Sequence, residues 1–149
     1  MAGVGYSGTP LSKKLGLKEG LAVSWVDAPD ELRGWLAPLP AGLTIDARPG
    51  PGSDLVHAFF TERARLASQL VAWRRALRTD VVLWISWPKK NQKTAAAALG
   101  AGAGAKVPTD ITEDVIREVA LPLGWVDVKV CAVSEVWSGL KLVVRKELR

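Results

Sequence analysis

The sequence is poor in the side chains that most often bind metals or act as nucleophiles. Its 149 residues include one histidine, one cysteine, one methionine, one tyrosine and two phenylalanines. A single cysteine excludes an internal disulfide, and one histidine with one cysteine cannot make a zinc site of the usual Cys and His spacing. The lack of disulfides suits a reducing compartment, so we expect a cytoplasmic protein with no metal site.

Long hydrophobic runs are also lacking. The longest apolar stretches, such as residues 81–87 and 130–133, are far shorter than the roughly 20 residues that a helix needs to span a bilayer. The N-terminus has neither the basic start nor the apolar core of a secretory signal. These absences predict that the chain has no membrane partner.

The chain does have the composition of a globular domain. Hydrophobic residues make up 48% and charged residues 23% of it. A chain of this size can bury roughly 70% of its unfolded surface, so one core is sufficient. We expect a single α/β domain over residues 1–149, with a flexible Ala- and Gly-rich loop at about residues 91–108.

The formal net charge of +5 raises the question of an anionic partner. Nucleic-acid binding domains gather their basic residues into a patch or stripe. Here most lysines and arginines are dispersed or lie near carboxylates, so the sequence disfavours a nucleic-acid partner while leaving it open.

Apolar runs alternate with helical patterns along the chain. We expect strands over residues 21–26, 43–46, 54–60, 81–87, 126–133 and 140–144. We expect helices after Pro29, over residues 62–78, and after Asp110, which forms a capping pair with Glu113. Ser138 and Gly139 are placed in the turn between the last two strands.

This alternation predicts a mostly parallel sheet between two helix layers, ending in an antiparallel hairpin. The pattern resembles the methyltransferase type of Rossmann-like fold, shortened by about one strand–helix unit. A likeness of fold does not by itself imply a function.

The turn after the first strand argues against ordinary cofactor binding. A dinucleotide or adenosyl cofactor is usually met there by a glycine-rich loop. Residues 27–31 instead read Asp-Ala-Pro-Asp-Glu, whose carboxylates repel a phosphate. No particular cofactor is therefore implied.

A candidate ligand site nevertheless follows from the topology, because open α/β sheets bind ligands at the carboxyl ends of their strands. Polar segments from four parts of the chain are expected near that edge. The candidate ligand-binding residues are Tyr6, Ser7, Thr9, Lys89, Lys90, Thr109, Asp110, Trp137 and Ser138. Two lysines, hydroxyls, a helix start and an indole ring suit an anionic, ring-bearing ligand.

Structural explanations compete with this site. Lys89 and Lys90 could pair with Asp110, Glu113 or Asp114. Thr109, Asp110 and Thr112 could have no role other than capping a helix. No catalytic set emerges. His57 lies inside a strand, where a structural role is expected, and Cys131 is expected to be a buried, inert thiol.

Several of these segments resemble the small bacterial family catalogued as domain of unknown function 3052. The resembling stretches are residues 6–11, 14–16, 86–90, 109–114, 126–133 and 137–141. The resemblance implies no particular activity, cofactor or catalytic residue.

Three functional hypotheses remain. The first is a non-catalytic or vestigial Rossmann-like binding domain that takes a protein partner or a small anionic ligand at the carboxyl edge. The second is a transferase-like enzyme that acts on a small molecule and binds an anion or an adenosyl cofactor. The third is a nucleic-acid binder, which predicts binding that weakens steeply with salt.

Overall fold

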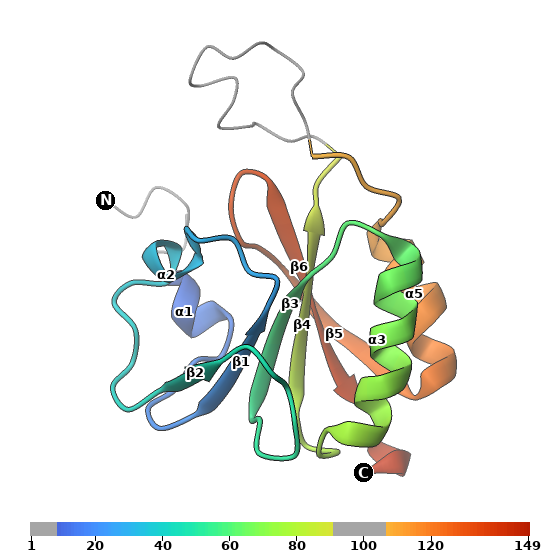
Figure 1. Cartoon of the computed structure of the whole chain (residues 1–149), viewed down its shortest axis with the longest axis horizontal. Coiled ribbons are helices and arrows are strands. Elements are labelled where there is room, and N and C mark those ends of the chain that lie inside the picture. The colour runs from blue at the N-terminus through green and yellow to red at the C-terminus, as the bar shows by residue number, and fades with distance from the viewer. Residues whose placement is uncertain (1–8, 91–106) are drawn as a thin grey trace.

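A computed structural model describes residues 9–90 and 107–149 of the chain, which form a six-stranded sheet with helices on both faces (Figure 1). The strand order is β2-β1-β3-β4-β6-β5. The strands are β1 (Ala22–Val26), β2 (Thr44–Asp46), β3 (Leu55–Phe59), β4 (Val82–Pro88), β5 (Trp125–Ala132) and β6 (Trp137–Val144).

Two helical layers cover the sheet. One face packs against α3 (Arg63–Ala76) and α5 (Glu113–Ala120), which contribute buried side chains such as Leu70 and Ile116. The other face packs against the short helices α1 (Leu11–Lys14) and α2 (Leu32–Trp35). Short 3₁₀ turns, η1 (Leu121–Leu123) and η2 (Lys146–Leu148), follow α5 and β6. The predicted three-layer arrangement is confirmed.

The first four strands are parallel, and the final hairpin is antiparallel, as predicted. The predicted central strand is β4, which lies between β3 and β6 and is buried along nearly its whole length. Because β6 runs against β4, β5 is again parallel to β4, and the hairpin turn returns to the carboxyl ends of the central strands.

The prediction for the hairpin turn was wrong in one respect. Ser138 and Gly139 lie inside β6, opposite Trp87 and Ser86 of β4. A Cβ atom on Gly139 would come within 3.2 Å of the Trp84 ring and of Val133. Packing in the sheet therefore accounts for this glycine, and a tight turn does not.

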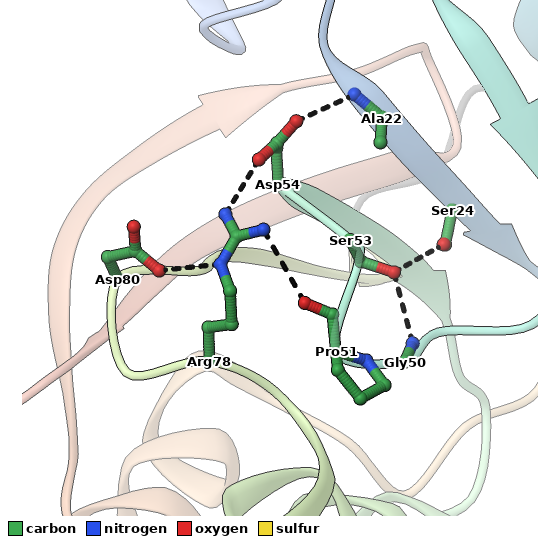
Figure 2. Close-up of polar contacts among 8 residues, drawn as sticks. All are labelled: Ala22, Ser24, Gly50, Pro51, Ser53, Asp54, Arg78 and Asp80. Carbon is green, nitrogen blue, oxygen red and sulfur yellow. Dashed lines mark hydrogen bonds and ion pairs between the residues drawn. The ribbon is translucent and has the colours of Figure 1, made fainter.

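The amino ends of the strands are joined by a network of polar groups (Figure 2). Asp54, which precedes β3, accepts a hydrogen bond of 2.8 Å from the backbone N–H of Ala22 in β1. Arg78, just after α3, donates to Asp54 at 2.6 Å and to Asp80 at 2.9 Å. Beside them, the Ser53 hydroxyl accepts from the backbone N–H of Gly50. The network thus ties two strands and a helix end together.

The expected Ala- and Gly-rich loop falls almost entirely outside the described residues. Of residues 91–108, only Val107 and Pro108 are described. Within the described part of the chain, no helix is long and apolar enough to cross a membrane.

Candidate functional site

The candidate site lies where the direction of chain crossover changes. The chain passes from β1 to β2 in one direction along the sheet, and from β3 to β4 in the opposite direction. The neighbouring carboxyl ends of β1 and β3 therefore form a topological switch point. Ligands of open α/β sheets bind at such a switch point. A cleft of about 420 Å³ is found there, lined by Asp27, Phe59, Phe60, Thr61, Glu62, Arg65 and Trp137.

Asp27 ends β1 and closes one side of the cleft. Its backbone is left-handed, with φ of 54°, a conformation that glycine adopts at lower cost. Its carboxylate accepts a 2.6 Å hydrogen bond from Arg65 of α3, and both side chains are about half exposed. An ion pair this open to water adds little stability. It does place a positive and a negative charge at the mouth of the cleft.

Aromatic rings form another part of the cleft wall. Phe59 and Trp137 meet edge to face, with ring centroids 5.1 Å apart and planes at 83°. Phe59 is buried, whereas Trp137 is half-buried and leaves part of its indole accessible. An accessible indole at a cleft offers a surface on which a planar ligand ring can stack.

Behind this aromatic pair lies His57, the only histidine of the sequence. It stacks on Phe59 at 4.5 Å, and its Nε2 shares a 2.7 Å hydrogen bond with the Ser86 hydroxyl. Burial lowers the pKa of His57 to about 3. The neutral ring is enclosed in the core, so the expected structural role fits this geometry.

Lys89 is brought next to Trp137. The backbone N–H of Lys89 donates a 2.7 Å hydrogen bond to the carbonyl of Val136, and Pro88 is the cross-strand partner of Trp137. Ser138 follows Trp137 in β6 and is half-buried opposite Trp87. The structure therefore gathers three of the predicted residues, Lys89, Trp137 and Ser138, on one corner of the carboxyl edge.

Thr109 and Asp110 are also at this edge, but their polar atoms hold the fold together. Thr109 Oγ1 donates to the carbonyl of Thr61 at 2.8 Å. Asp110 accepts a 2.7 Å bond from the N–H of Arg63, the first residue of α3. Together with Thr61, these two residues line an adjoining cleft of about 470 Å³.

The predicted capping pair was therefore wrong in its details. The N-cap of α5 is Thr112, whose hydroxyl accepts from the N–H of Val115, while Asp110 caps α3 from across the fold. Glu113 and Asp114 pair with Arg117, so they are not the partners of Lys89. Among the described residues, the Lys89 side chain makes no ion pair.

Four other predicted site residues are placed less directly. Tyr6 and Ser7 lie outside the described residues, and Thr9 is the first described residue, just before α1. Lys90 is exposed after β4. Cys131 was expected to be buried but is half-buried, because it lies in the edge strand β5. Burial still raises the pKa of its thiol.

The sequence analysis missed the cleft residues Phe59, Thr61 and Arg65. Their convergence depends on β3 being the neighbour of β1, and strand order is set by packing between distant segments. The one available signal was that Phe59 and Thr61 lie at the end of a buried strand that precedes a helix.

Solved structures support the fold. A SAM dependent methyltransferase from Aquifex aeolicus has a TM-score of 0.57 at 15% identity, covering 89% of this chain and 87% of that one. A putative type 11 methyltransferase from Sulfolobus solfataricus has a TM-score of 0.58 at 12% identity, covering 91% and 90%. Magnesium protoporphyrin IX methyltransferase from Synechocystis, solved with bound SAH, has a TM-score of 0.51 at 14% identity, covering 91% and 78%.

These likenesses establish a Rossmann-like fold of the methyltransferase type and do not establish an activity. No family model matches the sequence, and no curated protein is similar to it.

Proposed function

We propose that this protein is a small Rossmann-like binding domain that takes an anionic, ring-bearing small molecule at the carboxyl edge of its sheet. The observation that carries the proposal is the cleft at the switch point between β1 and β3, with the half-buried indole of Trp137 in its wall. The ligand ring stacks on Trp137, and its anionic group meets the ammonium of the neighbouring Lys89, which makes no ion pair with a described residue.

The first turn supports binding without an adenosyl cofactor. Asp27 stands where a glycine-rich loop would begin, and its carboxylate is held by Arg65 beside the cleft. Pro29 further removes a backbone donor that a phosphate or carboxylate could use. These features favour a ligand that enters from the Trp137 side of the cleft.

A transferase-like enzyme is the second candidate, and the position of the cleft favours it. The cleft lies at the switch point, where α/β folds bind their cofactors, and the fold is of the methyltransferase type. In this alternative an adenosyl cofactor displaces the exposed Asp27–Arg65 pair. Binding of S-adenosylmethionine would therefore distinguish the two candidates.

The test is thermal unfolding with four probes: phenyl phosphate, adenosine monophosphate, S-adenosylmethionine and inorganic phosphate. A ligand at 100 times its Kd stabilises the fold by about 2.7 kcal/mol, which is a shift of several degrees for a domain of this size. We expect shifts with the two ring-bearing phosphates and a smaller one with inorganic phosphate, which has no ring to stack.

The matched variants are Lys89→Ala and Trp137→Ala, with Lys146→Ala as the control, because Lys146 is exposed in η2 at the other end of β6. The first two should abolish the shift and the control should keep it. A shift with S-adenosylmethionine alone supports the enzyme. No shift with any probe overturns the small-ligand proposal and leaves a protein partner.

We also infer that the chain acts in the cytoplasm and belongs to the family catalogued as domain of unknown function 3052. The lack of disulfide-forming cysteines supports the first inference, and the residue stretches named above support the second.

A further inference from the structure

A second group of charged side chains lies on the sheet face that carries α1, away from the cleft. On that face Trp84 of β4 is the cross-strand partner of Lys141 in β6, which is in turn the partner of Lys129 in β5. The Trp84 indole donates a 2.9 Å hydrogen bond to the carbonyl of Leu15, so the end of α1 packs over this position. Across the sheet from Trp84, the next two residues in register are therefore both lysines, Lys141 and then Lys129.

Lys14, the last residue of α1, and Lys18, which follows that helix, join this row. The four residues, which we call the lysine patch, are Lys14, Lys18, Lys129 and Lys141. The pKa of Lys141 is lowered by burial and then by the positive charges of Lys129 and Lys18. Lys14 and Lys129 also act on the thiol of Cys131, where they oppose the effect of burial on its pKa. Together with the cross-strand pairing of Lys129 and Lys141, these effects group the four lysines on one part of this face.

The lysine patch is without ion pairs in the described part of the chain. None of its members makes an ion pair there, whereas the ion pairs between described residues are made by arginines. Like charges directly opposite on neighbouring strands are destabilising. Lys129 and Lys141 are such a pair, and Lys141 is in addition partly removed from water. An arrangement that opposes folding in this way is relieved by a bound anion.

We propose that the lysine patch binds a compact polyphosphate anion. Lysine ammonium groups suit phosphate oxygens as point charges, and several unpaired lysines at one place favour a group with more than one negative charge. A compact anion is favoured over a nucleic-acid backbone because Lys129 and Lys141 lie directly opposite each other on neighbouring strands, whereas backbone binding needs an extended basic stripe.

The lysine patch is separate from the proposed ligand cleft. Lys141 and Trp137 lie four residues apart along β6, a separation of about 13 Å in a strand. Lys89 is next to Trp137, so substitutions at Lys89 and at Lys129 test different sites.

The experiment is a calorimetric titration of the full chain with inorganic tripolyphosphate at low salt. We expect wild type to bind it, and Lys129→Gln to weaken the affinity by about tenfold, because one charge-assisted contact is lost. The double variant Lys129→Gln/Lys141→Gln should weaken it further. Lys146→Gln, which removes an exposed lysine in η2, should bind as wild type does.

A second measurement needs no ligand and guards against variants that fail to fold. Removing one of two opposed lysines relieves repulsion, so Lys129→Gln should unfold at the same or a higher temperature than wild type without phosphate. Equal affinities for tripolyphosphate in wild type and in the double variant would overturn the proposal. Tighter binding of a single-stranded oligothymidylate, lost in the same variants, would overturn it in favour of a nucleic-acid backbone.

Discussion

At the amino ends of β1 and β3, the Asp54 carboxylate links the two strands and also pairs with Arg78. At the carboxyl ends of the same strands, the Asp27 carboxylate makes only an exposed ion pair with Arg65. Both are aspartates paired with an arginine at 2.6 Å. They differ in their surroundings: Asp54 is 32% exposed and also accepts a backbone N–H, and Asp27 is 51% exposed and borders a cleft. The comparison teaches that one end of the sheet is closed by satisfied polar groups, while the other keeps its charges accessible.

The largest expected effect comes from breaking the closed end. Asp54→Ala leaves the N–H of Ala22 and the guanidinium of Arg78 without their carboxylate, which should lower the free energy of unfolding by about 2–3 kcal/mol. Asp27→Ala removes only a half-exposed pair and should cost less than about 1 kcal/mol before backbone effects. Urea denaturation of both variants checks this. Equal losses would show that the two ends do not differ in this way.

The next effect concerns His57, which lies behind the cleft wall. Its pKa is lowered by burial to about 3 in the folded state, and that of an unfolded histidine is about 6.5. As the pH falls below 6.5, the unfolded chain binds a proton that the folded chain does not, so stability falls by about 1.4 kcal/mol per pH unit. The loss amounts to about 2 kcal/mol at pH 5.

Denaturation between pH 7 and pH 5 measures this slope, because most carboxylates stay ionised over that range. His57→Gln should show a nearly flat profile over the same range, whatever its absolute stability. A wild-type profile as flat as that of the variant would contradict the depressed pKa.

A smaller effect separates structure from binding at Asp110. Asp110→Ala removes the cap of α3 and should cost about 1 kcal/mol, similar to the loss from Thr112→Ala, which uncaps α5. Phenyl phosphate should raise the unfolding temperature of both variants by about as much as it raises that of wild type, apart from the change that follows from their lower stability. If Asp110→Ala alone abolished that response, Asp110 would belong to the ligand site.

The smallest effect sharpens the comparison at Asp27. With φ of 54°, glycine fits this position with less strain than alanine, so Asp27→Gly should be more stable than Asp27→Ala by about 0.5–1 kcal/mol. Thermal unfolding of the two variants measures the difference. Equal stability would mean that the left-handed conformation at this position costs alanine nothing.

Much of the fold was predicted from patterns among neighbouring residues. The fully buried strand β3 and the helix α3 were predicted within a few residues, because unbroken apolar runs and a repeat of three and four residues specify strand and helix directly. The assignment of Asp110 failed because a side chain can cap a helix distant in sequence as readily as its own, and local spacing does not distinguish the two.

The sequence predicted that polar residues converge at the carboxyl edge, and it did not predict most residues of the cleft found there. That Lys89 and Trp137 meet at the carboxyl edge followed from the direction of the strands. The cleft residues and the lysine patch did not follow, since Arg65 pairs with Asp27, and Trp84 donates to the Leu15 carbonyl beside the lysines, only across the packed layers.

The sequence by itself determined the alternation of strands and helices, the absence of a glycine-rich first turn and the lack of a disulfide, because these depend on neighbouring residues or on composition. Tertiary structure alone decided the strand order, the cleft between β1 and β3, and the pairing of Lys129 with Lys141. The physical reason is that these features arise between segments far apart in the chain, whose partners are chosen by burial and packing of the whole core.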